Sequence, residues 1–544
     1  MEGQKNLRKF LYLCHQSLII KAQTMKEFNT TGICYPEDHY MVNIDSRVDE
    51  IEKAVAKGEY ITINRGRQYG KTTTLYHLAE KLRENYVVFS ISFESMGEAE
   101  FKDIESLSFA FADAFKSAID YEETQVNDLV ANAITETVAN ADNYKIKPKS
   151  LADLIVKINK NSSKPIVVII DEVDNASNYE SFIELLRMFR SKYLKRVQLP
   201  TFQSVILAGV YDIKNLKLKV RPDSDHQYNS PWNIAVAYTT DMSLPTDGIQ
   251  QMLQEYESDH HTGMDTALIA QMITDYTSGY PFFVSRVCQL IDKQNFSWDK
   301  EGLQNAVKIM LKEKNTFFDD LTKKLEDFKE ISQLLKDILL YGRSVSFNID
   351  NKFLNLASMF NFIREENGKV MIFNRVIETR LYNKFLSDEE ISNALYKQGD
   401  TDHSQFIDGK TLKMDKILEK FSQHFRDIYG SKDLTFKEEE GRRFFMLYIR
   451  PIINGTGNYY IEAQTRDRSR TDMIIDYFGT QYIIEMKIWR GESYNERGEN
   501  QLFDYLDFYH ADKGYLLSFC FNKNSKPKAR TIAQGGREIV EVVV

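Results

Sequence analysis

Cysteine is scarce in this chain, and the cysteines that occur lie far apart. There is no C-x-x-C pair and no cysteine beside a histidine cluster, so the pattern excludes a structural zinc site and fits a reducing cytoplasm. The four are Cys14, Cys34, Cys288 and Cys520. No apolar run approaches the ~18 residues that a membrane span needs. The apolar start is broken at residues 15–17 and no small-residue cleavage site follows, which argues against a signal peptide. We therefore expect a cytoplasmic protein with no membrane partner.

An excess of basic residues is absent as well. Lys and Arg number 70 against 79 Asp and Glu, which gives a formal charge of −9. A mildly acidic chain is not a general coat for nucleic acid, so any nucleic-acid site has to be a local basic patch. The 544 residues, 42 % of them hydrophobic and 27 % charged, are typical of a folded chain of several domains.

The first half of the chain alternates between strand and helix patterns. Strands are expected at residues 60–64, in "YVVFSISFES", in "KPIVVIIDEVDNA", at 204–210 and in "WNIAVAYTT", and helices at 46–57, 71–84, within 100–160 and at 179–193. The continuous apolar run "IVVII" is typical of a central parallel strand. This alternation predicts an α/β fold with a three-layer parallel sheet.

The second half changes character twice. Residues 246–340 have a helical pattern, and residues 353–386 predict a helix followed by a two-strand wing that turns at Asn367-Gly368. A polar stretch then leads to residues 412–544, where the pattern predicts helix, helix, strand, strand, helix, strand, helix, strand. The order predicts a multidomain protein whose last domain is again of the α/β class.

The stretch "RGRQYGKTTT", residues 65–74, resembles a phosphate-binding loop of the form G-x-x-x-x-G-K-[ST] with its first glycine missing. Arg65 stands where that glycine belongs. Gly70 lets the backbone approach a phosphate, Lys71 can reach the β- and γ-phosphates, and Thr72 can offer its hydroxyl to Mg²⁺, with Thr73 beside it. A strand before and a helix after the loop direct backbone N–H groups at the same place. The alternative is a loop that contains Gly-Lys-Thr by chance.

A second element favours the nucleotide site. Asp171 and Glu172 follow the apolar strand "IVVII" about 100 residues after the loop. An acid in this position holds Mg²⁺, and the next acid can orient or activate the attacking water. Strand termination alone also explains two acids, but the two elements together predict ATP binding, and Glu172 favours hydrolysis.

A third element is "TSGYPFFVSRVCQLI", where Gly279 and Pro281 open a helix. By itself this is compatible with an ordinary helix start. Together with "YITINRGRQYGKTTTL", "VVIIDEVD" and "SPWNIA", however, it resembles the bacterial AAA-ATPase-like proteins, which are related to the STAND ATPases. The resemblance implies that the shifted glycine is a family trait and that Gly279 and Pro281 lie beside the nucleotide base. Arg187 and Arg190 are candidates for an arginine finger or are solvated helix residues.

The last domain carries a second constellation, "RTDMIIDYFGTQYIIEMKIW". Glu485 and Lys487 are two residues apart in a strand and so project to the same face, while Asp472 begins the strand before the hairpin. Two carboxylates and a lysine at one end of a sheet suit phosphodiester cleavage, since the carboxylates can hold Mg²⁺ and the lysine can position water or offset charge. Charged strand ends are common, so the short motif alone is weak.

Two more features extend the pattern. Glu440 lies on the apolar stripe of a helix at 436–449, with Glu439 as a second choice, and Gln501 and Tyr505 share one face of a later helix. The spacing resembles the PD-(D/E)XK nucleases and their RecB-type branch, which implies that Glu440 completes the metal site with Asp472 and Glu485 and that Gln501 and Tyr505 line it. Alternatively, Tyr505 is a core residue and Gln501 a surface one.

Basic residues flank this constellation, namely Arg466, Arg468, Arg470, Lys523, Lys526, Lys528 and Arg530. They can contact phosphates without reading sequence, or form a solvated loop. We expect an ATPase that controls a Mg²⁺-dependent nuclease, with Mn²⁺ as an alternative ion. DNA is favoured over RNA as the substrate, and the chain is compatible with a homo-oligomer. By analogy of fold, the expected setting is bacterial defence or mobile-element control. The alternatives are an ATP-driven switch that binds nucleic acid without cutting it, and an ATPase that assembles with a protein partner.

The expected domains follow from these assignments. They are an N-terminal extension (1–24), an AAA-like P-loop core (25–245), a helical lid (246–340), a winged-helix-like module (341–390), a linker (391–411) and a restriction-endonuclease-like domain (412–544).

Overall fold

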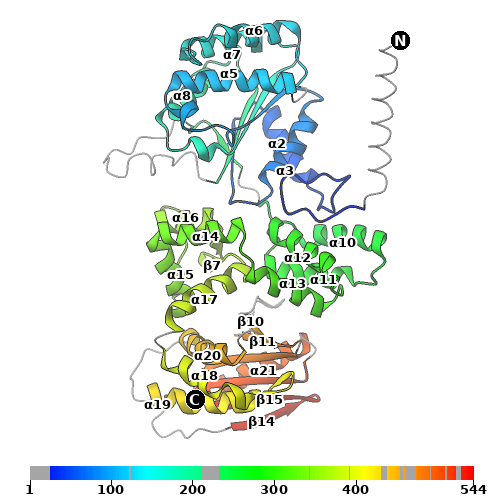
Figure 1. Cartoon of the computed structure of the whole chain (residues 1–544), viewed down its shortest axis with the longest axis vertical. Helices are drawn as coiled ribbons and strands as arrows, with labels where there is room; N and C mark the ends of the chain where they lie inside the picture. Colours follow the sequence, from blue (N-terminus) through cyan, green and yellow to red (C-terminus); the bar gives the residue numbers. More distant parts are fainter. Residues whose placement is uncertain are drawn as a thin grey trace. The chain divides into compact units, whose positions relative to one another are not determined.

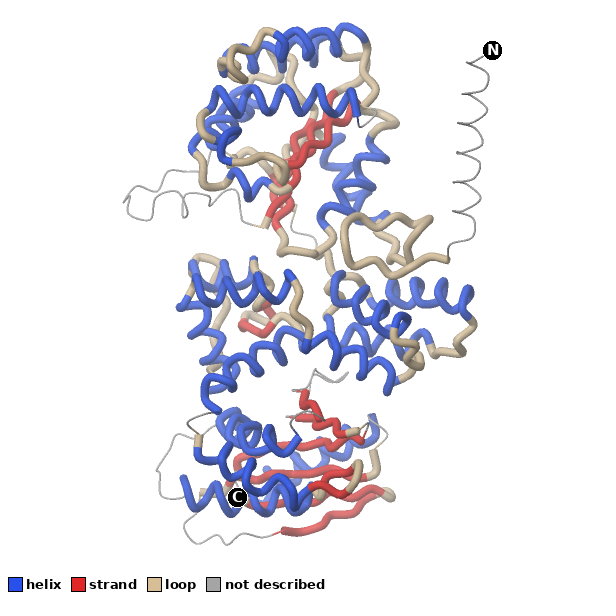
Figure 2. The backbone as a smooth tube through the Cα atoms, in the orientation of Figure 1, coloured by secondary structure: helices blue, strands red, loops and turns tan. Residues whose placement is uncertain are grey.

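The computed structural model describes most of the chain (Figures 1 and 2). It describes residues 25–544 except 122–123, 211–231, 239–240, 342, 391–392, 430–437, 454–456, 461–472, 479, 490–491, 509–510 and 522–528. Contacts divide the chain into two compact units, Met1–Ala270 with Tyr280–Lys293, and Gln271–Gly279 with Gln294–Val544. Within the described residues, no helix is both long and apolar enough to cross a membrane.

A five-stranded parallel sheet forms the centre of the first unit. Its strands are β1 (Ile61–Asn64), β2 (Val87–Ser92), β3 (Ile166–Asp171), β4 (Ser204–Gly209) and β5 (Val236–Ala237). They lie in the order β2-β3-β4-β1-β5, and every neighbouring pair is parallel. β3 and β4 are buried at each residue, as expected for apolar strands covered on both faces. The parallel α/β sheet that the alternating pattern predicted is therefore confirmed.

Helices cover both faces of this sheet (Figure 1). They are α2 (Asp45–Ala56), α3 (Lys71–Leu82), α4 (Glu98–Phe101), α5 (Ile104–Tyr121), α6 (Asp128–Ala139), α7 (Pro148–Asn161) and α8 (Glu180–Leu194), with the short η1 (Val173–Ala176) after β3. α2 and α3 lie on one side, and α5 to α8 on the other. The core on the α5 side includes Phe89 of β2, whose ring centroid lies 4.6 Å from that of Phe115.

The stretch expected as a helical lid is helical, but it divides between the units. α10 (Thr246–His260) and α12 (Pro281–Lys293) belong to the first unit, and the unit boundary runs through α11 (Thr266–Thr277). α13 (Lys300–Lys312), α14 (Thr316–Asp327) and α15 (Lys329–Tyr341) belong to the second. Helical periodicity alone does not reveal this division, because it is set by which surfaces the helices bury.

The expected wing is a two-stranded hairpin. β6 (Ile363–Glu366) and β7 (Lys369–Ile372) pair antiparallel between α16 (Lys352–Met359) and α17 (Arg375–Glu390). Asn367 and Gly368 both have positive φ, 52° and 76°, as a two-residue hairpin turn requires.

The polar stretch expected as a linker contains a packed helix. α18 (Ala394–Phe406) lies against α20 (Glu438–Ile453), and a Cβ at Gly399 would lie 2.1 Å from the backbone oxygen of Tyr448. A short pair, β8 (Ile407–Asp408) and β9 (Thr411–Leu412), follows. The polar composition concealed this helix because only a narrow stripe, including Leu395 and Phe406, is buried.

A mixed six-stranded sheet forms the C-terminal part of the second unit (Figure 2). Its elements are α19 (Met414–Tyr429), α20, β10 (Gly457–Tyr460), β11 (Met473–Tyr477), β12 (Thr480–Ile488), α21 (Glu492–Phe508), β13 (Lys513–Phe519), β14 (Ala529–Gln534) and β15 (Arg537–Val543). The strand order is β10-β11-β12-β13-β15-β14.

The predicted order for this region lacks the edge strand β10, and it assigns β14 wrongly. The pattern predicted a helix before the final strand, whereas β14 is a strand paired antiparallel with β15. The turn between them consists of Gly535 and Gly536, with φ of 59° and 82°. Gly-Gly between two short runs is a hairpin signal that the periodicity argument overlooked.

Candidate functional site

The phosphate-binding loop joins β1 to α3 at the carboxyl edge of the parallel sheet. β1 ends at Asn64, and α3 begins at Lys71. Two residues of the loop are left-handed, Gln68 at φ 55° and Gly70 at φ 79°. Arg65 and Gly66 are not among the described residues with positive φ. An arginine can therefore occupy the position of the missing glycine without backbone strain, because the left-handed turn falls later in the loop.

Lys71 is drawn into the loop. Its side chain is buried, and Nζ donates hydrogen bonds to the backbone oxygens of Arg65 and Gly66, each at 3.1 Å. The ammonium group thus lies in the concave side of the turn, next to the amino terminus of α3. A bound phosphate at this helix terminus meets both a positive charge and backbone N–H groups.

Two tyrosines that the sequence argument did not consider hold the loop. Tyr69 is buried, its hydroxyl lies 2.6 Å from Oγ of Ser243, and its ring meets that of Tyr280 edge-on at 4.7 Å. The Tyr280 hydroxyl donates to the backbone oxygen of Arg67. Burial raises the pKa of Tyr69 to about 12, so the phenol stays neutral. The signal was present in the sequence, as the Tyr of "QYGKT" and of "GYP".

The acidic pair after β3 faces this loop. Oγ1 of Thr72 donates to Oδ2 of Asp171 at 2.7 Å, and the backbone N–H of Glu172 donates to Oδ1 at 2.9 Å. A hydroxyl and a carboxylate in contact form the all-oxygen donor set that Mg²⁺ prefers, so these residues fit the ion. Glu172 is left-handed at φ 53°, and burial raises the pKa of its carboxyl group, an effect that the charge of Lys71 opposes.

The next residues brace the acidic pair. Asp174 accepts a hydrogen bond from the backbone N–H of Val210 at 2.5 Å. A Cβ on Gly209 would lie 2.9 Å from a methyl group of Val173, so the end of β4 must be glycine for η1 to pack there. Sequence reasoning assigned no role to Asp174 or Gly209, since their contact exists only in the folded sheet.

A cavity of about 370 Å³ adjoins the loop. Gly70 and Thr73 line it on the loop side, and Pro281 lies opposite, its Cγ 3.8 Å from where a Cβ of Gly70 would be. Apolar side chains make up much of the wall, namely Met41, Val42, Ile44, Leu244, Met252 and Phe282. The volume and apolar wall are typical of a ligand pocket and suit a planar base. Gly279 is not among the described residues that line the cavity; its φ of 69° turns the chain into α12.

The sequence of this region also matches a family model, that of the AAA-like domain, over residues 37–388. The match covers more than half of the chain and includes the loop, the acidic pair and the cavity. The chain belongs to the AAA-like domain family. It therefore carries an ATP-binding AAA-like P-loop domain of the ATPase class, which confirms this part of the sequence prediction.

Three of the solved structures to which the chain is similar are a Walker-type ATPase, Cdc6p and an ORC1 protein. A Walker-type ATPase of Pyrococcus abyssi is 16 % identical with a TM-score of 0.45, covering 65 % of this chain and 99 % of that one. Cdc6p of Pyrobaculum aerophilum is 11 % identical with a TM-score of 0.33, covering 66 % and 97 %. The Aeropyrum pernix ORC1 protein, solved in complex with DNA, is 10 % identical with a TM-score of 0.27, covering 64 % and 94 %. No curated protein matches the chain.

In the second unit, Glu485 and Lys487 lie together near the carboxyl end of β12. Glu485 is fully buried, and Nζ of Lys487 lies 2.6 Å from its Oε1. The described register places Met473 of β11 opposite Ile484. Asp472 precedes Met473 in the sequence and lies outside the described residues, as do Arg466, Arg468 and Arg470. The same holds for Lys523, Lys526 and Lys528.

One glutamate of α20, Glu438, contacts the same strand end. Oε1 of Glu438 accepts a hydrogen bond from the backbone N–H of Ile488 at 3.2 Å, one residue after Lys487. Glu440, the predicted metal ligand, is two residues further along and half-buried. Its neighbour Gly441 fixes the helix on the sheet, since a Cβ there would lie 2.4 Å from the ring of Phe519. The contact at Glu438 was not foreseen from the sequence.

Gln501 and Tyr505 of α21 are joined to each other. Nε2 of Gln501 donates to the Tyr505 hydroxyl at 2.6 Å, and Tyr505 is fully buried. One turn earlier on the same helix, a Cβ at Gly498 would lie 3.2 Å from Cγ of Lys487. α21 thus packs over the face of β12 that carries Lys487, and the glycine leaves room for the lysine.

Three further arginines were candidates for contact with phosphate or for an arginine finger. Arg530 pairs with Glu541, which is buried, and with Glu499, so it is engaged within the sheet rather than held out for phosphate. Arg187 is exposed on α8 and Arg190 is half-buried. Asp476 of β11 is fully buried and pairs with Lys308 at 2.7 Å. Among the described residues there is no group of three or more His, Cys, Asp or Glu that would hold a metal ion.

Proposed function

We propose that ATP binding and hydrolysis by the AAA-like domain control a Mg²⁺-dependent nuclease formed by the C-terminal sheet. The observation that carries the nuclease proposal is the pair of Glu485 and Lys487. A carboxylate that is fully buried and in contact with a lysine is costly to maintain, and such groups collect at sites that use them.

In the AAA-like domain, we assign a role to each polar residue of the phosphate loop and the acidic pair. Lys71 and the first turn of α3 bind the phosphates, while Thr72 and Asp171 would hold Mg²⁺, which when bound neutralises charge between the β- and γ-phosphates. Glu172 accepts a proton from the attacking water, since its carboxyl group is partly buried and lies within the electrostatic influence of Lys71 and Asp171. The adjoining apolar cavity takes the base.

In the C-terminal domain, Glu485, Asp472 and Glu440 would hold Mg²⁺, which when bound polarises the scissile phosphate. Lys487 holds the attacking water or offsets the charge that develops on the phosphate, and its contact with Glu485 keeps it at the strand end. Gln501 and Tyr505 orient the wall formed by α21. Carboxylate oxygens and a lysine are the kinds of side chain that this chemistry requires, which supports the proposal.

Nuclease assays on the purified full-length chain test the proposal. The substrates are double-stranded DNA, single-stranded DNA and single-stranded RNA, each with Mg²⁺ or Mn²⁺, and with or without ATP. Lys487→Ala is expected to reduce cleavage by on the order of 10²-fold or more, as removal of a group that stabilises the transition state does. Lys513→Ala on the neighbouring strand β13 serves as the matched control, since Lys513 pairs with Asp415 at 3.0 Å.

Lys71→Ala separates the two activities. It is expected to abolish ATP binding and to remove any effect of ATP on cleavage while leaving ATP-independent cleavage in place. Lys81→Ala is the control on the same helix, because Lys81 is bonded to Asp49 and Glu52 away from the loop. If the wild-type chain binds nucleic acid but cuts none of the substrates with either ion, the nuclease proposal is wrong and the chain is a non-cleaving, ATP-driven switch.

A further inference from the structure

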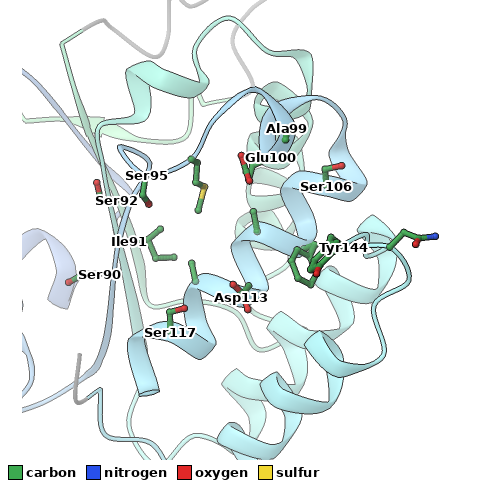
Figure 3. Close-up of a pocket in the computed structure, with 15 residues that line it drawn as sticks. Ser90, Ile91, Ser92, Ser95, Ala99, Glu100, Ser106, Asp113, Ser117 and Tyr144 are labelled. Atoms are coloured by element: carbon green, nitrogen blue, oxygen red, sulfur yellow. The ribbon is translucent and has the colours of Figure 1, made fainter. Parts of the chain in front are cut away.

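A second cavity, of about 620 Å³, lies in the first unit and shares no described lining residue with the cavity beside the phosphate loop (Figure 3). The end of β2, helices α4 and α5, and the turn at Asn143 and Tyr144 enclose it. Figure 3 shows Ile91, Ser95, Glu100, Asp113 and Ser117 around one open space. Nothing proposed above for ATP or for nucleic acid uses this space.

One wall of the cavity is the edge of a sheet. Within the part of the chain that the structure describes, β2 is the outer strand of the parallel sheet and pairs with β3 on one side alone. The backbone N–H groups of Val87 and Phe93 donate to the oxygens of Pro165 and Asp171 on the β3 side. The backbone N–H and C=O groups of the odd-numbered residues of β2 therefore face β3, and those of the even-numbered residues face away from the sheet. The outward backbone oxygen of Val88 accepts from Oγ1 of Thr124 at 3.2 Å. The next two outward positions, Ser90 and Ser92, line the cavity.

Those two positions offer backbone hydrogen bonds to an additional strand. Within the described residues, no partner covers the outward N–H and C=O groups of Ser90 and Ser92. An open edge of this kind pairs readily with an extended peptide, and proteins normally protect such edges. Here Thr124 protects the strand edge at Val88, whereas the edge at Ser90 and Ser92 faces the cavity.

The charge of the cavity is negative. Glu100 and Asp113 are the charged residues among the described residues that line it, and neither lysine nor arginine is in that set. Glu100 uses Oε2 to accept the N–H of Gly97 at 2.8 Å. Asp113 is half-buried and extends from α5 into the space. A basic side chain in the cavity therefore meets two carboxylates, with Lys145 and Lys116 outside the lining and near the carboxylates of Asp103 and Asp113.

The rim carries an aromatic ring in an unusual backbone conformation. Asn143 and Tyr144 are both left-handed, with φ of 48° and 58°, a conformation that a tyrosine adopts only where its surroundings enforce it. The Tyr144 side chain is 78 % exposed and meets the ring of Phe109 edge-on at 5.4 Å. Lys145, paired with Asp103 at 2.7 Å, anchors the turn. Exposed aromatic rings beside carboxylates suit the alkyl chain and charge of lysine or arginine.

We propose that this cavity binds an extended basic segment of a protein partner as an added strand along the open edge of β2. The backbone of Ser90 and Ser92 pairs with the segment, Asp113 and Glu100 bind its basic side chains, and Tyr144 covers one of them. The site is independent of the nuclease proposal, since it depends only on residues of the first unit. It gives the AAA-like domain a means of recognising a partner by an unfolded, positively charged stretch.

The sequence itself supplies a probe with the required pattern. In residues 214–221, KNLKLKVR, apolar and basic side chains alternate over residues 216–221. A fluorescein-labelled peptide of this sequence is titrated with the full-length chain and followed by fluorescence anisotropy. Three peptides are compared with it: the charge-reversed ENLELEVE, the non-alternating KKKNLLVR of the same composition, and KNPKPKVR, whose prolines remove backbone donors. Only the first is expected to bind tightly, with the others at least tenfold weaker.

Variants assign the binding to the cavity. Asp113→Lys and Tyr144→Ala are expected to weaken binding of KNLKLKVR by tenfold or more, while Asp153→Lys, an exposed acid on α7 outside the cavity, leaves it unchanged. Hydrogen exchange mass spectrometry is expected to show protection of fragments that span residues 88–95 when the peptide is bound. ATP binding by each variant reports that the first unit remains folded.

Several results would overturn the proposal. They are the absence of binding to the wild-type chain at millimolar peptide, equal binding by Asp113→Lys, and equal binding of the non-alternating peptide. Binding without protection of residues 88–95 would mean that the peptide attaches by charge elsewhere. If spermidine displaces the peptide at equal concentration, the cavity is a site for small polyamines and not for a strand.

Discussion

Position 65 illustrates what single residues decide in this protein. A phosphate loop usually begins with glycine, and here Arg65 contributes only its backbone oxygen to Lys71, while its guanidinium donates to the oxygen of Asn64 at 2.8 Å. The left-handed residues are Gln68 and Gly70 instead. Within the loop, Tyr69 packs against Tyr280, whose hydroxyl donates to the backbone oxygen of Arg67, so aromatic packing fixes the loop from the side of α12.

Glu172 provides a prediction about pH. Burial disfavours its charged form and raises its pKa above the ordinary 4.5. In its proposed role as general base, Glu172 is active as the carboxylate. ATPase activity is therefore expected to fall as the pH drops through the raised pKa, which lies above 4.5. The pH dependence of kcat, measured with saturating ATP and Mg²⁺, checks this.

Substitution isolates the same carboxyl group. Glu172→Gln is expected to lower kcat by on the order of 10²-fold or more while ATP still binds, because a general base is lost and the phosphate contacts remain. Glu180→Gln, an exposed acid at the start of α8, is the control. Full activity of Glu172→Gln would show that another group activates the water.

Tyr144 allows the cost of its backbone conformation to be measured. Both Tyr144→Ala and Tyr144→Gly remove the ring, but only glycine adopts φ near 58° without steric cost. The glycine variant is therefore expected to be more stable than the alanine variant by about 1 kcal/mol in urea unfolding. Equal stabilities would mean that the turn relaxes and that the left-handed conformation is not imposed by the fold.

Among the elements, α18 is defined by what it packs against. Gly399 faces the backbone of Tyr448 so closely that a Cβ would lie 2.1 Å from its oxygen. On an exposed helix, Gly→Ala raises stability by about 1 kcal/mol. Here Gly399→Ala is expected to lower the free energy of unfolding by about 1–3 kcal/mol, because the neighbouring backbone has no room to move.

The control for this helix lies on its outer face. Ser404→Ala, at an exposed position of α18, is expected to leave stability unchanged within about 0.5 kcal/mol or to raise it. Urea unfolding of both variants gives the comparison. A stabilised Gly399→Ala variant would show that α18 is not packed on α20 in solution.

The two sheets show where element prediction succeeded and failed. Strand, loop and helix were foreseen for β1, the phosphate loop and α3, because the buried Leu75, Leu78 and Leu82 repeat with helical spacing. β14 was mistaken for a helix. Its residues are mostly exposed, so they give no apolar alternation, and pairing with β15 alone makes them a strand.

At the scale of the whole molecule, the chain consists of two compact units. The phosphate loop, the acidic pair and both cavities belong to the first, while Glu485 and Lys487 belong to the second. Trp232 is buried in the first unit, and Trp298 and Trp489 lie in the second. The three tryptophans therefore report on the units separately.

ATP is expected to stabilise the first unit selectively. A ligand at 100 times its Kd adds about 2.7 kcal/mol to the state that binds it. In a variant that keeps only Trp232, ATP with Mg²⁺ is expected to raise the thermal unfolding midpoint, and in one that keeps only Trp298 and Trp489 the midpoint is expected to stay constant. Lys71→Ala should remove the first effect. Equal shifts for both reporters would mean that the chain unfolds as one cooperative unit.

The sequence by itself determined the parts of this protein that depend on neighbours along the chain. The phosphate loop, Asp171 and Glu172 at the end of an apolar strand, and the hairpin at Asn367-Gly368 follow from local spacing and turn chemistry. Only the tertiary structure decided which distant surfaces meet. The bracing of the loop by Tyr280, the packing of α18 through Gly399, and the cavity beside the open edge of β2 arise from contacts between residues far apart in the chain, which no local pattern specifies.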